Sequence, residues 1–212
     1  MKERLVNAIS DMQEDEAIRV AREMLDSGND PQEILDASRE AMAIVGNRYE
    51  RKEYFLPELI IAGDILKEIG AMVRPRLKAG GGGKTLGKVL LGTVAGDIHD
   101  IGKDIVVSLL KAANYDVRDL GVDVPPQKVV DAVKETGATV VGLSGLLTIA
   151  FDSMKETVAA LATAGLRSKV KVMIGGGFVS ETVQHYAGAD AWGMDAQAAV
   201  SLCNQWIKEV AK

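Results

Sequence analysis

The sequence predicts a two-part α/β protein, in which a bundle of helices precedes a parallel β-sheet flanked by helices. Apolar residues recur at helical spacing through the first third of the chain, and short apolar runs then alternate with helical stretches, which is typical of βαβ units. The glycine run Gly80–Gly83 separates the two patterns and has the composition of a flexible linker. We therefore expect a helical domain over residues 1–78, a linker over 79–86 and an α/β domain over 87–212.

The N-terminal part is expected to form a four-helix bundle with short connections. Gly28 and Asn29 are typical of a helix C-terminus, so we expect the second helix to end there. Asp30 is placed to cap the third helix, with Pro31 at its first position. The fourth helix is expected to run from about Pro57 to Val73.

The C-terminal part is expected to form a five-stranded parallel sheet flanked by helices, a Rossmann-like (flavodoxin-like) arrangement. The strands are expected at residues 88–94, 116–120, 139–144, 170–175 and 189–192. The helices are expected near residues 102–113, 126–136, 150–164, 179–187 and 195–210. In such a sheet, ligands bind beyond the C-terminal ends of the strands, where the strand order reverses.

Composition narrows the class of protein. The chain has 212 residues, of which 47% are hydrophobic and only 4% aromatic, so aliphatic side chains must fill the core. Cys203 is its one cysteine, which excludes a disulfide or a thiolate zinc site within the chain. No apolar run reaches the roughly 18 residues that span a membrane, and the N-terminus is amphipathic, so we expect a cytoplasmic protein without a membrane partner. The net charge of −5 comes from the N-terminal part, so we expect no nucleic-acid partner.

The segment Gly96–Lys103 is the strongest candidate for chemistry. It lies between an apolar strand and a helix, and it holds His99, one of two histidines in the chain, with Asp97 two residues earlier. A neutral imidazole binds a metal through one nitrogen, while a carboxylate on the other nitrogen fixes its tautomer and direction. The pair therefore predicts an oriented metal ligand, the alternative being a solvent-exposed turn histidine.

Two further segments are expected at the same edge of the sheet. Gly142–Thr148 follows the third strand, and Ile174–Phe178 follows the fourth. Glycines at these positions allow a large flat or elongated ligand to approach the main chain closely. Ordinary tight turns are the alternative reading of both segments.

The three segments together carry the pattern D-x-H-x-x-G, then 41 residues, S-x-L, then 28 residues, G-G. The residues that carry it are Asp97, His99, Gly102, Ser144, Leu146, Gly175 and Gly176. By this pattern the chain resembles the cobalamin-binding family. Glu53–Leu59 is similar to the cap segment of the methyl-transferring members, which include the B12 module of methionine synthase and the corrinoid proteins of anaerobic methyltransferase systems. The resemblance covers nearly the whole chain.

The resemblance implies a bound cobalamin that alternates between methylcobalamin and cob(I)alamin, in the base-off, His-on form. His99 would be the lower axial ligand of the cobalt and the one metal ligand from the protein. Asp97 would accept the other imidazole proton, and Ser144 would hydrogen-bond that carboxylate and complete a relay. These three are the candidate catalytic residues. Since His99 would leave the metal and return, proton uptake is expected to accompany reduction or demethylation.

The resemblance also implies a wider set of cofactor contacts. Gly102 would allow close packing beside the corrin or its nucleotide tail. Leu146 and Thr148 would line a slot for the tail, and Gly175–Gly177 would make room for it. Phe55 would cap the methyl face of the corrin, unless it is a core aromatic of the bundle. The whole candidate set is Phe55, Asp97, Ile98, His99, Asp100, Ile101, Gly102, Ser144, Leu146, Thr148, Gly175, Gly176, Gly177, Phe178 and Met194.

The implied function is that of a methyl carrier that completes no turnover alone. A donor:corrinoid methyltransferase would load the methyl group, a corrinoid:tetrahydrofolate (or thiol) methyltransferase would remove it, and a reductive activator would rescue oxidised cobalt. O-demethylation of methoxylated aromatics is the expected system, with methanol, methylamines and glycine betaine as other donors. Three alternatives stay open: a B12-dependent transcriptional sensor, a subunit of an adenosylcobalamin mutase, and a protein that stores or delivers B12.

Several other noticeable residues are expected to be structural. Gly80–Thr85 superficially resembles a phosphate-binding loop, but Lys78 stands where that pattern needs glycine. His185 is expected on the surface. The residues expected to pack in the core are Trp192, Cys203 and Trp206.

Overall fold

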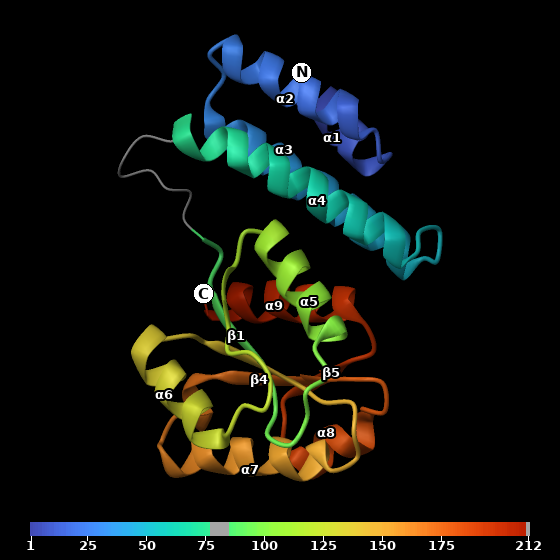
Figure 1. Ribbon diagram of the computed structural model, residues 1–212. Coiled ribbons are helices and arrows are strands. Elements are labelled where there is room, and N and C mark those ends of the chain that lie inside the picture. Colours follow the sequence, from blue (N-terminus) through green and yellow to red (C-terminus); the bar gives the residue numbers. More distant parts are fainter. Residues whose placement is uncertain (77–84, 211–212) are drawn as a thin grey trace. The chain divides into compact units, whose positions relative to one another are not determined.

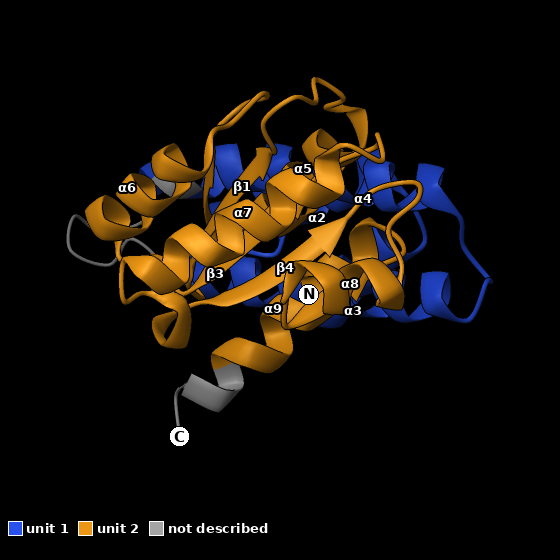
Figure 2. Ribbon diagram, turned by 90° about the horizontal axis from the view of Figure 1, so that it is seen from below, with its two compact units in different colours: residues 1–85, 112–114 blue, residues 86–111, 115–212 orange. Residues whose placement is uncertain are grey.

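The computed structural model describes residues 1–76 and 85–210. The chain divides into two compact units (Figure 2). They consist of residues 1–85 with 112–114, and of residues 86–111 with 115–212. The glycine run expected as a linker, and the phosphate-loop resemblance that overlaps it, lie outside the described residues.

The first unit, in its described part, is a bundle of four helices (Figure 1). They are α1 (Lys2–Ser10), α2 (Glu14–Asp26), α3 (Pro31–Glu50) and α4 (Leu56–Val73), followed by a short 3₁₀ turn at Arg74–Arg76. Both α1 and α4 pack against α2 and α3. Large apolar side chains on the inner faces are fully buried, among them Leu5, Met24, Ile34 and Ile65. Burying each is worth about 1.5–3 kcal/mol, so packing stabilises the bundle more than helix propensity does.

The boundaries in this bundle follow the predicted signals. Asp30 accepts a hydrogen bond from the N–H of Gln32 at 2.9 Å and is the N-cap of α3. Gly28 has a φ of 80°, and the N–H of Asn29 donates to the carbonyl of Met24, which ends α2 as predicted.

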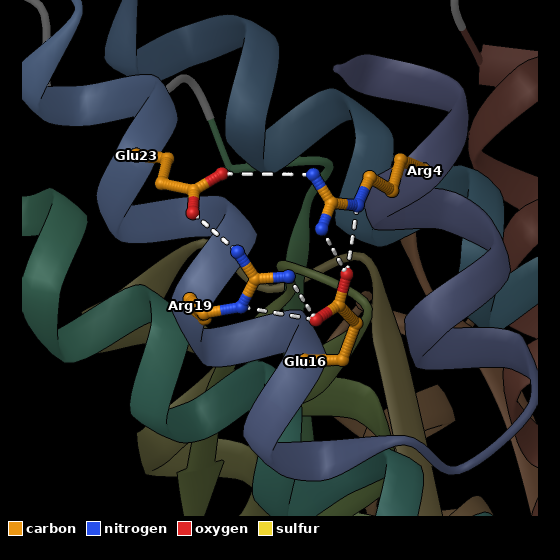
Figure 3. Close-up of polar contacts among 4 residues, drawn as sticks. All are labelled: Arg4, Glu16, Arg19 and Glu23. Carbon is orange, nitrogen blue, oxygen red and sulfur yellow. Dashed lines mark hydrogen bonds and ion pairs between the residues drawn. The ribbon is translucent and has the colours of Figure 1, made fainter.

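Four charged side chains join α1 to α2 (Figure 3). Arg4 on α1 donates to Glu16 at 2.7 Å and lies 3.7 Å from Glu23, both on α2. Arg19, also on α2, pairs with the same two carboxylates. Exposed pairs of this kind are worth about 0–1 kcal/mol each, so the cluster sets how α1 and α2 approach more than it stabilises the bundle.

The second unit is built on a parallel sheet with the strand order β2-β1-β3-β4-β5. The strands are β1 (Lys88–Thr93), β2 (Asp116–Asp119), β3 (Val140–Ser144), β4 (Lys171–Gly175) and β5 (Ala191–Gly193). The helices are α5 (Ile101–Ala112), α6 (Pro126–Thr136), α7 (Ala150–Thr163), α8 (Glu181–Ala187) and α9 (Ala196–Val210), with a 3₁₀ turn at Arg167–Lys169. In Figure 1, α5 and α9 lie on one face of the sheet, and α6, α7 and α8 on the other. The predicted fold class is confirmed, with small shifts at the ends of elements.

The strand order reverses between β1 and β3, which are neighbours although β2 lies between them in the sequence. Thr93 at the end of β1 pairs with Ser144 at the end of β3, and Ser144 pairs with Gly175 at the end of β4. The three segments singled out in the sequence therefore leave the sheet side by side at one edge. This edge is where a sheet of this topology places a binding site.

The structure confirms the predicted packing of the cysteine and tryptophan side chains and the predicted exposure of His185. Cys203 and Trp206 are buried, and Trp192 packs against the core. Burial raises the pKa of the Cys203 thiol to about 12, which makes it unreactive as a thiolate. The His185 side chain is 72% exposed, as predicted. Among the described helices, none combines the length and the apolar character needed to cross a lipid bilayer.

Candidate functional site

His99 and Asp97 form the centre of the site, on the loop between β1 and α5. The Nδ1 atom of His99 lies 2.7 Å from Oδ1 of Asp97, and this oxygen also accepts the main-chain N–H of His99 at 3.0 Å. The Asp97 side chain is fully buried, whereas the His99 side chain is 50% exposed. The imidazole therefore holds its Nδ1 against the protein and leaves Nε2 as the nitrogen available to a ligand.

The Asp97 carboxylate uses all four of its acceptor positions. Oδ2 accepts the main-chain N–H groups of Leu146 and Leu147 at 2.7 and 3.0 Å, while Oδ1 accepts both bonds from His99. Burial by itself raises the pKa of Asp97, but the hydrogen bonds from His99, Leu147 and Leu146 outweigh it and hold that pKa well below its usual range. Asp97 is therefore ionised at neutral pH, so the proton between the two side chains belongs to Nδ1 of His99.

The sequence analysis expected the Ser144 hydroxyl to hydrogen-bond to Asp97, and the structure corrects this expectation. Among the described residues, the donors to Oδ2 of Asp97 are the main-chain N–H groups of Leu146 and Leu147. The turn after β3 points these two groups at the carboxylate, which then has no acceptor position left for a hydroxyl. The carbonyl of Ser144 accepts the N–H of Val94 at 3.0 Å and so joins the ends of β1 and β3.

Thr93 anchors the His99 loop, a role that the motif does not predict. Its side chain is fully buried, and its hydroxyl donates to the carbonyl of His99 at 2.9 Å. The only sequence signal for this role is a threonine that ends an otherwise apolar strand. This hydrogen bond fixes the main chain of His99 to the end of β1.

Lys103 is a buried cation in the first turn of α5, and it too lies outside the predicted set. Its Nζ lies 2.5 Å from Oδ1 of Asp104 and 2.6 Å from Oδ2 of Asp119, at the end of β2. Burial lowers the pKa of Lys103, but the two carboxylates raise it by more. Its spacing from Val107 and Leu110, on the buried face of α5, is the signal that could have found it. The ion pair with Asp119 fastens the start of α5, and with it the end of the His99 loop, to β2.

The glycines at this edge of the sheet have different reasons to be glycine. A Cβ at Gly176 would lie 1.8 Å from the carbonyl oxygen of Gly145, and Gly176 has a φ of 146°, so the protein's own packing requires it. A Cβ at Gly177 would lie 2.9 Å from the Leu146 side chain. A Cβ at Gly102 would meet no protein atom within 4 Å. Gly102 therefore faces open space, where a ligand can come close to the helix backbone.

The remaining polar and small residues of the predicted set lie at the ends of elements. Asp100 and Thr148 are exposed, and their carbonyls accept N–H groups in the first turns of α5 and α7. Gly175 ends β4, and a Cβ there would lie 3.7 Å from the carbonyl oxygen of Gly193, so it is not crowded.

Large apolar side chains are exposed on the second unit, several of them on the loops that follow the strands. Among them are Ile98, Ile101, Leu147, Ile149, Phe178 and Met194. Leu147 and Ile149 were not in the predicted set. Covering apolar surface is favourable by about 25 cal/mol per Å², so these loops suit a broad ligand with much apolar surface.

Phe55 belongs to the first unit, on the loop before α4. Its side chain is 66% exposed, so it is not packed in the bundle core. Its N–H donates to the carboxylate of Glu58 at 2.8 Å, a helix-capping contact. The place of Phe55 over a corrin stays a prediction.

The donor set fits a corrinoid. Within the described residues, no cluster of three or more His, Cys, Asp or Glu side chains is placed to hold a metal ion. A single imidazole oriented by a buried carboxylate supplies one ligand, which suits a metal whose other ligands come from a macrocycle. The exposed apolar side chains and the open space beside Gly102 suit the ring itself.

Comparisons with known proteins identify the family of this chain. Residues 87–201 match the family described as B12 binding domain, and residues 1–73 match a second family with the same description. The chain is 36% identical to dimethylamine corrinoid protein 2 of Methanosarcina mazei, over 97% of this chain and 98% of that protein. It is 37% identical to trimethylamine corrinoid protein 1 of Methanosarcina acetivorans, over 92% of this chain and 91% of that protein.

Solved structures show the same relationship. A cobalamin-binding protein from Desulfitobacterium hafniense DCB-2 has a TM-score of 0.83 and 40% identity, over 97% of this chain and 98% of that one. A chain of the methanol:cobalamin methyltransferase complex MtaBC from Methanosarcina barkeri has a TM-score of 0.83 and 29% identity, over 97% of this chain and 78% of that one. This chain belongs to the B12-binding family. Its cofactor is a corrinoid.

Proposed function

We propose that this chain is a methyl-carrying corrinoid protein in which His99 is the lower ligand of the cobalt. The observation that carries the proposal is the His99–Asp97 pair, with Nδ1 held 2.7 Å from a buried carboxylate and Nε2 left for a metal. Relatives named as corrinoid proteins, aligned over 97% and 92% of this chain, support it.

The residues of the site orient the His99 imidazole and keep a proton on its Nδ1 atom. When bound, the corrinoid supplies a cobalt centre that takes up and releases a methyl group. Asp97 keeps the His99 proton on Nδ1, because the pKa of its own carboxyl is held too low to compete for it. Nε2 of His99 would hold the cobalt of a bound corrinoid. Were it released from the metal, Nε2 would be free to accept a proton, so we expect proton uptake to accompany loss of this ligand.

The partners of such a carrier are two methyltransferases and a reductive activator. Its relatives are named for dimethylamine, trimethylamine and methanol, so small donors of these kinds are the first to test for this chain. None of these three is named for O-demethylation, the system expected from the sequence. A cytoplasmic location and a capping role for Phe55 are part of the proposal.

The carrier role is favoured over a sensor or a mutase subunit by the extent of the match. The two corrinoid relatives are covered over 98% and 91% of their own lengths, so both units of this chain have counterparts in them. Transfer of a methyl group to or from the bound cobalt is what separates a carrier from a protein that only stores B12.

The test is a transfer experiment with protein reconstituted with methylcobalamin. Wild type, His99→Ala and the surface control His185→Ala are mixed anaerobically with candidate methyltransferases and acceptors, and the methyl–cobalt absorption is followed. We expect methyl transfer in wild type and in His185→Ala, and much slower methyl transfer in His99→Ala. Bound corrinoid that no methyltransferase can demethylate or remethylate would contradict the carrier role.

A further inference from the structure

A second aspartate holds the loop that carries His99, and it lies outside the motif. Asp123 is on the connection between β2 and α6, and its main chain has a φ of 50°. Non-glycine residues adopt this left-handed conformation at some cost, aspartate less than most, and such residues cluster where a local geometry has a purpose. This turn of the main chain lets the Asp123 side chain reach the loop between β1 and α5.

Asp123 bonds to the loop on both sides of the peptide that joins Gly96 to Asp97. Its Oδ1 accepts the N–H of Gly96 at 2.8 Å, and its own N–H donates to the carbonyl of Asp97 at 3.0 Å. The next residue, Val124, forms a parallel bridge with Val94, so the clamp continues from the sheet. A shift of Asp123 would carry the main chain of Asp97 with it.

The rest of the loop is held from other directions. On α7, the Ser153 hydroxyl donates to the carbonyl of Ala95 at 2.8 Å. Thr93 holds the carbonyl of His99 at 2.9 Å. Main-chain groups of residues 95, 96, 97 and 99 thus have protein partners, so the loop is shaped before any ligand binds.

We propose that Asp123 is a positioning residue for the lower ligand: by clamping Gly96 and Asp97 it sets the direction in which His99 presents Nε2. The proposal rests on the proposed function of His99. It follows from the chain of contacts, since Asp123 fixes the Asp97 backbone and the Asp97 carboxylate fixes the imidazole. Loosening the clamp leaves the corrinoid bound but makes histidine ligation less favourable.

The experiment is a potentiometric titration of the corrinoid-loaded protein between its Co(II) and Co(I) states, with a chemical reductant. Histidine ligation stabilises Co(II) over Co(I), so weaker ligation raises the midpoint potential. Asp123→Gly accommodates the left-handed backbone and removes the side chain with its carboxylate. Losing one hydrogen bond is expected to weaken ligation about fivefold, which is about 40 mV upward at 59 mV per tenfold change.

Two variants separate positioning from charge and from general loosening. Asp123→Asn removes the charge but keeps an acceptor oxygen for Gly96, so its shift is expected to be clearly smaller than that of Asp123→Gly. Asp30→Ala removes a carboxylate-to-N–H bond of the same kind in the first unit and is expected to leave the potential unchanged. Equal shifts for Asp123→Asn and Asp123→Gly, a shift in Asp30→Ala as large as that in Asp123→Gly, or no shift in Asp123→Gly would overturn the inference.

His99→Ala distinguishes a failure of this inference from a failure of the proposed function. If its potential equals that of wild type, His99 is not the ligand, and both ideas fall. If it lies well above wild type while Asp123→Gly matches wild type, the ligand stands and the positioning role of Asp123 falls. Should Asp123→Gly not fold, a wild-type potential in Asp123→Ala, measured on loaded protein, overturns the role in the same way.

Discussion

The Oδ2 atom of Asp97 accepts the main-chain N–H of Leu146 at 2.7 Å, so one carboxylate joins the loop after β1 to the loop after β3. The same carboxylate orients the His99 imidazole through its other oxygen. The orientation of the His99 imidazole and the contact between the two loops therefore depend on the same carboxylate. A change at Asp97 should alter both.

The substitution Asp97→Asn tests this link. An amide cannot accept four N–H groups, because its nitrogen would face donors, so buried donors lose their partner. The expected result is a loss of about 2–4 kcal/mol in the free energy of unfolding, measured by urea denaturation without corrinoid. Asp116→Asn, at the exposed start of β2, is the control and should unfold like wild type. An Asp97→Asn variant as stable as wild type would show that the carboxylate does not hold the two loops.

The pH dependence of stability follows from the same carboxylate. The pKa of Asp97 is lower in the folded protein than its unfolded value of about 3.9, so its contribution is complete above that pH and is lost as the pH falls below it. The pKa of Asp119 is lowered as well: burial raises it, but the hydrogen bonds from Lys103 and from the N–H of Gly121 lower it by more. Wild type should lose stability steeply below about pH 4, and Asp97→Asn should show a shallower slope. Parallel curves for the two proteins would speak against this assignment.

The buried Lys103 should matter for stability rather than for chemistry. Lys103→Met keeps the length of the side chain but leaves Asp119 without its cation, so we expect a loss of about 1–3 kcal/mol in the free energy of unfolding. The double variant Lys103→Met/Asp119→Leu should recover part of that loss, because the uncompensated charge is gone. Chemical denaturation of the wild type, both single variants and the double variant gives the coupling energy. A coupling energy near zero would mean that the pair does not fasten α5 to β2.

Two glycine substitutions should have opposite effects. Gly176→Ala places a Cβ against the Gly145 carbonyl in a conformation that disfavours it, so a loss of about 3 kcal/mol or more is expected. Gly102→Ala meets no protein atom and lies in the first turn of a helix, so stability should rise by up to about 1 kcal/mol. Thermal unfolding checks both, and corrinoid affinity should fall in Gly102→Ala. Unchanged affinity there would place the corrinoid away from Gly102.

The fold was predictable because its signals are local. Alternating strands and helices show in the apolar pattern, and the cap at Asp30 depends on residues next to it. The contact between Asp97 and His99 was also predictable, since the two residues are two positions apart and their types suffice to suggest the geometry.

The supports of the site were not predictable in the same way. The motif suggested the Ser144 hydroxyl as the partner of Asp97, but the donors are main-chain groups, which every residue except proline has and no pattern of side chains reveals. Asp123 bonds to Gly96 across 27 positions of the sequence, and that contact exists only once β1 and β2 are paired. The topology had to be known first.

The most direct test of the central claim is an electron paramagnetic resonance spectrum of the Co(II) protein grown with ¹⁵N-histidine. The chain has two histidines, so His185→Gln removes the only other labelled imidazole. If Nε2 of His99 binds the cobalt, each cobalt line splits into three with ordinary histidine and into two with the labelled form, in wild type and in His185→Gln, whereas the spectrum of His99→Ala does not change with the label. A wild-type splitting that does not change with the label, or a label-dependent splitting that persists in His99→Ala, would contradict the account.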